Sequence, residues 1–510
     1  MPTHFIAIDL VKVYKTTVKS KSNLKTVLSW GDEVDLIENK ASYLKIGLKD
    51  FDEKPDGSIL QTITEGFILK ASGNNPALNT ILKQIADKDV LQVSFVDVQQ
   101  GDGCVVESPK GKVLLIDGGE NQIFARYLAA KYCGSSAQNP KVIDCITVSH
   151  GDADHFEGLP LILESETNQS PKKRLFINPL RVFHNGIVKR PGKKPDGIKR
   201  KDTELLGNIT KAGNQLYLTG LEEDLLQVPD ASLNEPFKKW KNALQEYNDF
   251  YNSNIQFKRL DNTSTGDFDF LASENINVQV LGPIVSEVNN RPALKFLRQP
   301  SKVITHIDDA DDAPSGAYSA SHTINGQSVI LRLKYGNVSF LFAGDLNEEA
   351  EDILVAASGT NPIQSEILKV PHHGSADFSN KFFEAVKPLV SIVSSGDESE
   401  MKEYIHPRAT LMGALGKHSR IDRPLIFVTE LVAFFKREGW SRVTAKQPAG
   451  KVAPEYFGFS RTAYGIVHVR TDGKKILVFT HSGQKDLKEA YCFKIENDGD
   501  LPVRQEVIMA

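Results

Sequence analysis

The segment IDCITVSHGDADH, residues 143–155, decides the predicted fold. Its first half is an apolar run rich in β-branched residues, which predicts a buried strand over most of that half. Its second half places His150, Asp152, Asp154 and His155 directly after that strand. Imidazoles and carboxylates gathered at a strand end can hold a divalent metal through mixed nitrogen and oxygen ligands. The alternative interpretation of this segment alone is a charged turn with incidental histidines.

Two later strands are predicted to end in the same residue types. The apolar run Val338–Phe342 leads into Asp345, and the run Glu366–Val370 leads into His372 and His373. A Gly-Asp turn or a His pair beside a glycine is weak evidence when taken singly. Three strand ends that each deliver His or Asp are hard to explain as surface turns, so we predict a metal centre where they meet.

The chain from Leu91 onward alternates strand-like runs with helical patterns, and one helix is predicted over 122–131. This alternation predicts an α/β layered domain whose active loops follow the strand ends. The other predicted strands of this part are 91–98, 104–107, 113–116, 143–149, 276–281, 328–333, 338–341, 367–370, 389–393 and 466–469.

The first seventy residues have a different character. Residues 1–70 alternate apolar and polar positions between Gly, Asp and Asn turns, which predicts a small all-β domain. The stretches WGDEV at 30–34 and EGFI at 65–68 resemble the divergent turn and closing strand of a bacterial SH3-like barrel. An N-terminal extension of the main sheet is the alternative. Residues 71–90 are predicted to be a linker that ends in a connecting helix through Ile85.

Residues 187–275 are predicted to be an insertion over the catalytic face of the domain that spans 91–510. The insertion becomes helical and amphipathic around 237–251 and opens with a basic run from Lys189 to Lys201. Such a run would grip phosphates locally. The side chains that we assign to substrate binding are Lys193, Lys194, Arg200 and Lys201. A solvated loop without a catalytic role is the alternative.

The ordered motifs resemble those of the metallo-β-lactamase superfamily, whose first motif is H-x-H-x-D-H. Here the motif stands as His150-x-Asp152-x-Asp154-His155, and its Asp at the second position resembles the soluble nuclease-like domain of ComEC-type competence proteins. The resemblance covers about 91–470 and implies a four-layer αββα sandwich. It extends through VDVQQGD at 96–102, LIDGG at 115–119, NGQS at 325–328, AGD at 343–345 and LKVPHHGS at 368–375, ending near His406.

Laid on the matched positions, the resemblance implies two divalent metal ions, zinc or manganese. His150 and Asp152 would hold the first ion, and Asp154 and His155 would hold the second. Asp345 would bridge the two. The carboxylate that replaces a histidine favours harder ions such as manganese beside zinc.

The resemblance also implies roles for residues beside the metals. His373 would complete the second ion, and His372 would lie beside the scissile group as a proton donor or phosphate contact, although which of the two ligates stays open. Asp154 would additionally orient the attacking hydroxide. His406 would contact the phosphate, with a turn before a helix as the alternative.

The first ion usually takes a third histidine from a strand that precedes the bridging Asp. His322 lies 23 positions before Asp345 and fits this expectation. His184 is the second candidate. For either residue, the alternative is a loop histidine that is satisfied by hydrogen bonds.

Composition limits the partners of the chain. Its 510 residues carry a net charge of −4, which argues against a protein that coats nucleic acid through overall positive charge. The four cysteines have no paired spacing, so we expect reduced thiols. We find no signal peptide and no apolar run of membrane-spanning length, and therefore expect a cytoplasmic protein without a membrane partner.

Three functions compete on this evidence. The first is a nuclease that hydrolyses DNA or RNA through a hydroxide activated by two metals. The second is a phosphodiesterase acting on a small molecule, such as a cyclic nucleotide or a choline-phosphate ester. The third is a non-catalytic metal-binding module whose SH3-like domain recruits a protein partner.

Overall fold

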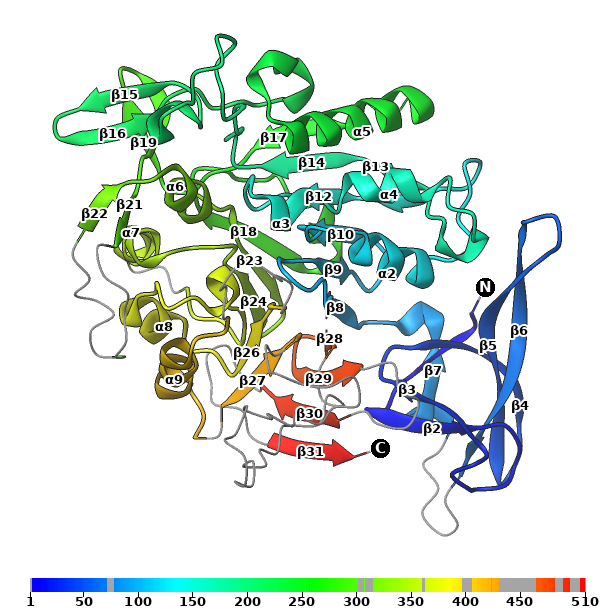
Figure 1. Cartoon of the computed structure of the whole chain (residues 1–510). Helices are drawn as coiled ribbons and strands as arrows, with labels where there is room; N and C mark the ends of the chain where they lie inside the picture. The colour runs from blue at the N-terminus through cyan, green and yellow to red at the C-terminus, as the bar shows by residue number, and fades with distance from the viewer. Residues whose placement is uncertain are drawn as a thin grey trace, which may run out of the picture.

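The computed structural model describes most of the chain, and Figure 1 shows its arrangement. Within the described residues, no helix is both long enough and apolar enough to cross a membrane. The described ranges are 2–70, 78–252, 254–300, 307, 315–359, 363–396, 406–422, 424–430, 465–481, 489–495 and 505–509.

The N-terminal residues form strands, as their alternating pattern predicts. They lie at one end of the molecule, drawn in blue in Figure 1, and bury a cluster of their own that includes Val13, Leu44 and Ile46. The SH3-like barrel type stays a prediction. The strands are β1 (His4–Ile6), β2 (Leu10–Tyr14), β3 (Leu24–Ser29), β4 (Glu33–Asn39), β5 (Tyr43–Glu53) and β6 (Ile59–Leu69).

The predicted connecting helix is wrong in its extent. Helix α1 (Leu78–Ile81) makes a single turn, and β7 (Leu82–Gln84) then pairs antiparallel with β1, with Ile6 opposite Leu82. The edge of β1 offers backbone groups that need partners, and Leu82 is buried in the N-terminal cluster. Pairing with this edge therefore outweighs the local helical pattern. Residues 71–77 of the predicted linker lie outside the described residues.

A ten-stranded sheet forms the first half of the main domain in the described part of the chain. Its order is β17-β14-β12-β10-β9-β8-β28-β29-β30-β31, and the four strands from β10 to β17 run parallel. The strands are β8 (Leu91–Phe95), β9 (Cys104–Glu107), β10 (Val113–Ile116), β12 (Cys145–Thr147), β14 (Arg181–His184), β17 (Gln256–Arg259), β28 (Ile466–Thr471), β29 (Lys475–His481), β30 (Glu489–Lys494) and β31 (Gln505–Met509).

The strand predicted over 143–149 is interrupted at Asp144. Strand β11 (Lys141–Ile143) pairs with β13 (Ile177–Pro179), whereas β12 joins the large sheet. The carboxylate of Asp144 accepts a hydrogen bond from the backbone nitrogen of Val113 at 2.8 Å. This bond, together with the one from the Asp144 nitrogen to the Val113 carbonyl, moves the chain from one sheet to the other.

A six-stranded sheet faces the first one, with the order β18-β23-β24-β25-β26-β27 in the described residues. Strands β24 to β27 run parallel. The strands are β18 (Ile276–Gly282), β23 (Ile330–Tyr335), β24 (Val338–Phe342), β25 (Ile367–Lys369), β26 (Val390–Val393) and β27 (Leu425–Val428).

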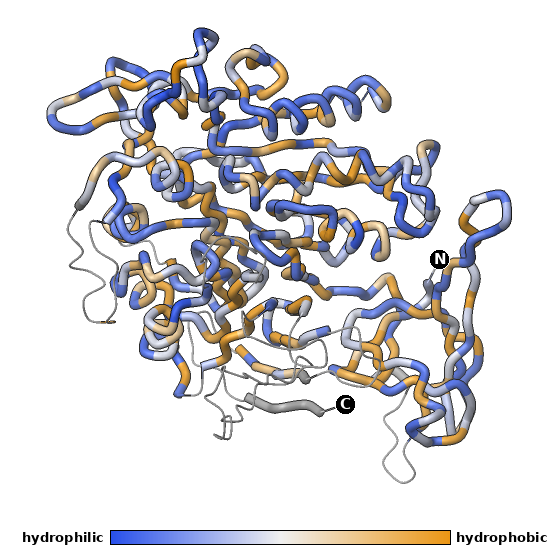
Figure 2. The backbone as a smooth tube through the Cα atoms, viewed as in Figure 1, coloured by the Kyte–Doolittle hydropathy of each residue, from blue (hydrophilic) through white to orange (hydrophobic). Residues whose placement is uncertain are grey.

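The apolar strand runs are continuous because both faces of each sheet are covered. Along β24, Phe340 and Phe342 enter a cluster shared by the two sheets, whereas Leu341 packs toward helices on the other face. Figure 2 shows hydrophobic segments concentrated in these strands. The helices packed on the first sheet are α2 (Ile123–Lys131), α4 (Pro160–Ser165) and α5 (Glu235–Tyr251), and those on the second are α7 (Glu348–Ser358), α8 (Asn380–Val386) and α9 (Ala409–His418).

The segment 187–275, predicted to be an insertion, contributes a strand and a helix to the main domain. The segment contains β17, an integral strand of the ten-stranded sheet, and α5 buries Phe237, Trp240 and Leu244 against that sheet. Its strands β15 (Ile209–Ala212) and β16 (Gln215–Leu218) pair onward with β20 (Arg291–Lys295) and β19 (Val285–Val288), which lie beyond residue 275. The segment is therefore packed into the domain, and this packing removes its apolar face from water.

Candidate metal centre

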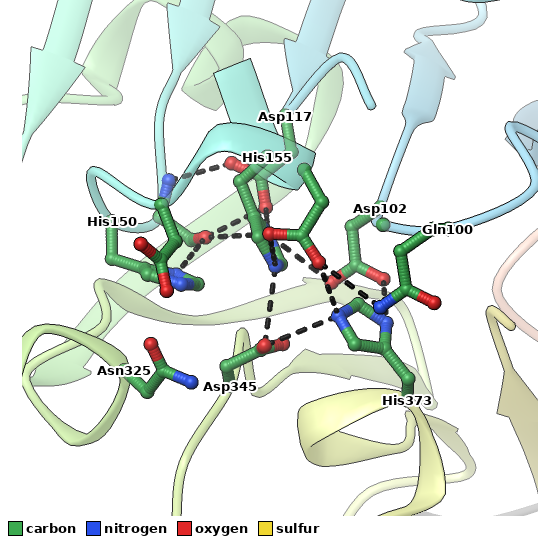
Figure 3. A network of polar contacts seen from close by, with 12 residues as sticks. Gln100, Asp102, Asp117, His150, His155, Asn325, Asp345 and His373 are labelled. Atoms are coloured by element: carbon green, nitrogen blue, oxygen red, sulfur yellow. Dashed lines mark hydrogen bonds and ion pairs between the residues drawn. The ribbon is translucent and has the colours of Figure 1, made fainter. Parts of the chain in front are cut away.

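The carboxyl ends of parallel strands from both sheets meet at one place, where ligand-bearing loops are expected. Strands β10 and β12 lead into Asp117 and His150, and helix α3 (Ala153–Phe156) follows at once with Asp154 and His155. From the other sheet, β24 leads into Asp345 and β25 leads into the His372–His373 pair. Figure 3 shows His150, His155, Asp345 and His373 pointing toward one another.

Four side chains form the centre of the site, and we call them the quartet: Asp154, His155, Asp345 and His373. The Nε2 atoms of His155 and His373 lie 3.2 and 3.1 Å from Oδ2 of Asp345. His373 Nε2 also lies 3.3 Å from Asp154 Oδ2, and His155 Nε2 lies 3.9 Å from Asp154 Oδ1. The structure thus brings together four of the predicted ligands from distant parts of the chain.

The turn that carries the His pair has an unusual backbone. His372, His373 and Gly374 have φ values of 46°, 52° and 84°, the left-handed region that non-glycine residues rarely adopt. The turn aims His373 into the quartet, and its Nδ1 makes a 2.9 Å hydrogen bond with the Ser394 carbonyl. His372 lies outside the quartet, with its ring 6.1 Å from that of His406. A strained turn of this kind is typical of a functional site.

His150 belongs to the other half of the predicted site. Its ring nitrogen Nδ1 lies 3.1 Å from the Ser149 hydroxyl and 3.2 Å from the Ser328 hydroxyl. Its Nε2 is buried without a hydrogen-bond partner, and ligand atoms of His150, His155 and Asp345 all lie within 4.8 Å of one another. His150 is therefore positioned to share a ligand with the quartet.

Two carboxylates and a lysine that the sequence analysis did not assign surround the quartet. Asp117 Oδ2 lies 2.9 Å from His155 Nδ1, a carboxylate contact that orients the ring. Asp102 contacts the buried ammonium of Lys369, which donates to the Gly344 carbonyl at 3.0 Å. Asp117 follows an apolar strand, as the predicted ligands do, and Lys369 is a charge inside one. These two features of the sequence could have identified Asp117 and Lys369 as candidate site residues.

The electrostatics of the quartet follow from burial and close charges. Burial alone would lower the pKa values of His155 and His373, but the nearby carboxylates have the larger effect. Asp345 and its neighbours raise the pKa of His155 well above its usual range and that of His373 to about 10. Burial would likewise raise the pKa of Asp345, yet His155 and His373 hold it well below its ordinary value. A metal ion that binds these imidazoles must displace protons.

The histidines outside the quartet behave differently. Burial lowers the pKa of His150 and of His406 to about 3 each, with a further contribution from nearby imidazoles. Burial also lowers the pKa of His372. These rings are neutral at pH 7, which is the state needed for a ligand or for a neutral hydrogen-bonding group.

The two candidates for a third histidine lie elsewhere. His322, on α6 (Ala320–Gly326), has its Nε2 3.4 Å from Asp377, and His184 has both ring nitrogens in contact with backbone atoms of Glu223 and Gly186. Neither joins a group of described His, Cys, Asp and Glu side chains with ligand atoms within 4.8 Å of one another. Their ligand roles stay predictions.

The predicted substrate-binding residues also lie outside the quartet. Lys194 pairs with Glu204 at 2.7 Å, Arg200 donates to the Pro191 carbonyl at 3.0 Å, and Lys193 and Lys201 lie in the same segment. Their role stays a prediction. Another residue of the basic run, Lys189, does reach the site, and its Nζ lies 2.8 Å from Asp152 Oδ1.

Residues 96–207 match the model of the metallo-beta-lactamase superfamily. The chain therefore contains a metallo-β-lactamase domain, and this fold implies divalent metal ions, typically zinc.

Two curated proteins are similar to a short part of the chain. The chain is 35% identical over 95 residues to Competence protein ComA of Neisseria gonorrhoeae, and 30% identical over 96 residues to ComE operon protein 3 of Bacillus subtilis (strain 168). These matches cover 18% and 19% of this chain but only 13% and 12% of the relatives. A solved structure, a long form RNase Z from yeast, aligns over 82% of this chain and 49% of its own at 8% identity, with a TM-score of 0.25.

Proposed function

We propose that this protein is a metal-dependent phosphodiester hydrolase that cleaves DNA or RNA. The observation that carries the proposal is the quartet, in which buried imidazoles and carboxylates from two sheets converge. The stretches similar to competence proteins, together with the basic residues between Lys189 and Lys201, favour a nucleic acid over other phosphodiesters.

The residues fit a divalent metal. Two buried ligand atoms, His150 Nε2 and Asp345 Oδ1, have no hydrogen-bond partner, and the Nε2 atoms of His155 and His373 contact the carboxylates of the quartet. Buried polar atoms without partners are costly, so such atoms aimed at one point favour a ligand there. We infer that the quartet would hold one ion and that His150 and Asp152, with Asp345, would hold a second. Mixed nitrogen and oxygen ligands suit zinc or manganese.

The remaining side chains have separate tasks in this proposal. When bound, the ions would lower the pKa of a water toward neutrality and stabilise charge on a phosphoryl oxygen. Asp154 keeps part of its side chain exposed, and nearby His155 lowers its carboxyl pKa against the effect of burial. It therefore stays ionised and can accept a hydrogen bond from the attacking water. Neutral His372 and His406, whose rings lie 6.1 Å apart, would contact the phosphate.

We infer further that the two sheets and their helices are the four layers of an αββα sandwich, supported by the three hydrophobic clusters of the main domain. The N-terminal strands would form the SH3-like barrel that recruits a protein partner. The apolar side chains of Ile37, Leu60 and Ile63 are each more than two-fifths exposed there. Replacing Ile37 and Ile63 by Ser should weaken partner binding and leave hydrolysis unchanged.

The proposal is tested by assaying the full chain, loaded with Zn²⁺ or Mn²⁺, against single-stranded DNA, duplex DNA, RNA and a chromogenic phosphodiester. We expect metal-dependent cleavage of at least one nucleic acid, lost in Asp345→Ala and retained in Asp352→Ala on the outer helix α7. Hydrolysis of the small diester alone would support a small-molecule phosphodiesterase instead. Metal binding with no hydrolysis of any substrate would support a binding module.

A second comparison tests the nucleic-acid assignment. We expect simultaneous replacement of Lys193, Lys194, Arg200 and Lys201 by Ser to raise KM for DNA and leave the small diester unaffected. Each phosphate contact that is lost should also reduce the slope of log affinity against log salt by about 1. An equal effect on both substrates would contradict a role of this segment in binding nucleic acid.

A further inference from the structure

The two halves of the metal centre differ in the contacts that their ligand atoms make before any ion binds. His150 Nε2 and Asp345 Oδ1 make no hydrogen bond, and the Nε2 atoms of His155 and His373 contact carboxylates of the quartet itself. Asp154 Oδ2 accepts from a neutral donor, the Gln100 amide, at 3.2 Å, whereas Asp152 Oδ1 accepts from the Lys189 ammonium at 2.8 Å. With the Asn325 amide oriented so that its nitrogen donates, that nitrogen lies 3.1 Å from Asp152 Oδ2. Both oxygens of Asp152 therefore already have donors.

Asp152 is also not gathered with its supposed co-ligands as the other ligands are. It belongs to none of the groups of described His, Cys, Asp and Glu side chains whose ligand atoms lie within 4.8 Å of one another, although His150, His155 and Asp345 do form such a group. A metal ion at His150 would need the Asp152 carboxylate to turn inward. That movement breaks its contact with the Lys189 ammonium.

Hydrogen bonds fix the main chain around Lys189, whereas its side chain is less constrained. Its carbonyl accepts from Asn234 nitrogen at 2.8 Å, and the next residue, Arg190, donates to the Leu205 carbonyl at 2.8 Å. Its side chain is about one-third exposed, and it also interacts electrostatically with Glu157. The ammonium can thus leave Asp152 for another carboxylate or for water while the main chain stays in place.

We propose that Lys189 competes with a metal ion for Asp152, so that the quartet binds one ion tightly and the site at His150 and Asp152 binds a second ion weakly. Two effects act in the same direction. The ion must displace an ammonium from its ligand, and an ion beside Lys189 experiences like-charge repulsion. The inference rests on the metal binding proposed above, but not on the identity of the substrate.

The test measures metal binding rather than catalysis. Chain stripped with a chelator is titrated with Mn²⁺, with binding followed by calorimetry and by the electron paramagnetic resonance signal of free Mn²⁺. We expect the wild type to bind a first ion at least tenfold more tightly than a second. Lys189→Met should tighten the second ion by about tenfold, equivalent to about 1.4 kcal/mol, and leave the first unchanged. This size exceeds the roughly 0–1 kcal/mol of an exposed ion pair, because the like-charge repulsion between Lys189 and the ion is removed as well.

Three control variants make the test specific. Lys189→Arg keeps the positive charge and should keep the second ion weak. Lys193→Met removes a lysine from the same basic run, and both affinities should stay at the wild-type values. Asp152→Asn should lose the weak ion and retain the tight one. Far-ultraviolet circular dichroism and melting temperature confirm that each variant is folded.

Two equal affinities in the wild type, or a second ion that Lys189→Met fails to tighten, would overturn the proposal. Loss of the tight ion in Asp152→Asn would do so as well, because it would place Asp152 in the tight site. These results are separable from failure of the proposed function. Stepwise binding with no hydrolysis would retain the inference and reject the nuclease, whereas hydrolysis with two equal ions would do the reverse.

Discussion

Replacing Asp117 by Asn removes one negative charge from the site and changes almost no volume. The Asp117 carboxylate accepts from the Ser149 nitrogen and the Ser149 hydroxyl, each at 2.7 Å, and contacts His155 Nδ1 at 2.9 Å. An amide can offer an oxygen to only some of these groups. Where its nitrogen faces His155 Nδ1, two donors meet unless the ring moves its proton to Nε2. The proton would then cover the nitrogen that faces the quartet.

The size of the effect follows from this geometry. Replacing a residue that orients a metal-bound histidine usually weakens metal binding by about 10- to 100-fold, or about 1.4 to 2.8 kcal/mol. Asp117 is almost fully buried and makes three polar contacts, one with His155 and two with Ser149, so we expect Asp117→Asn to fall in the upper part of that range.

The assay is competition of the stripped chain for Zn²⁺ against a chromogenic chelator at pH 7.5. Asp144→Asn is the matched control, since Asp144 also follows a strand and accepts a backbone hydrogen bond but does not contact the quartet. An affinity for the tight ion within twofold of wild type in Asp117→Asn would refute the reasoning, because the carboxylate would then not fix the tautomer of His155.

Three further predictions use other parts of the structure. Chelation should lower the melting temperature by several degrees, since an ion at about 100 times its Kd stabilises the fold by about 2.7 kcal/mol. Scanning calorimetry with and without metal measures this difference, and an unchanged melting temperature would contradict the prediction. Burial, with Glu246 nearby, raises the pKa of Glu166 to about 7, so its contribution to stability is complete below its ordinary value of 4.5 and is lost as the pH rises through 7. Glu166→Gln should flatten urea-measured stability over that range and Glu164→Gln should not, and equal curves for Glu166→Gln and wild type would contradict this. A short phosphorothioate oligonucleotide should tighten the second Mn²⁺ ion in the wild type by drawing Lys189 away from Asp152, and in Lys189→Met it should have little effect. Tightening of the same size in both proteins would exclude Lys189 as the link.

The strands were the most predictable part of the fold. The bounds of β9 and β10 match the sequence prediction, and those of β24 differ by one residue, because their apolar runs are buried on both faces and end at polar turns. The pattern failed where a partner from elsewhere decided the conformation. Leu82–Gln84 became a strand because β1 needed a neighbour, and Asp144 divided a strand by bonding to Val113.

The candidate site was predictable to the extent that it depends on strand ends. His150, Asp345 and His373 each follow a strand within a few residues, Asp154 and His155 lie on the short helix that comes next, and the sheets bring those ends together. Lys369 is conspicuous as a charge inside an apolar strand, but its pairing with Asp102 could not be assigned in the same way. Their importance comes from a contact between two loop and strand positions far apart in the chain, which no local pattern records.

The difference between the two halves of the site depends on contacts of the same long-range kind. Asp152 belongs to the motif that decides the fold, and its spacing from His150 gives it the same expected role as any other ligand. Lys189 lies 37 positions later, in a basic run whose charge pointed to the substrate rather than to the metal. Its backbone position after β14 brings the ammonium to Asp152. A ligand motif therefore fixes which atoms are available to an ion, whereas the neighbours added by the fold set how strongly each ion must compete for them.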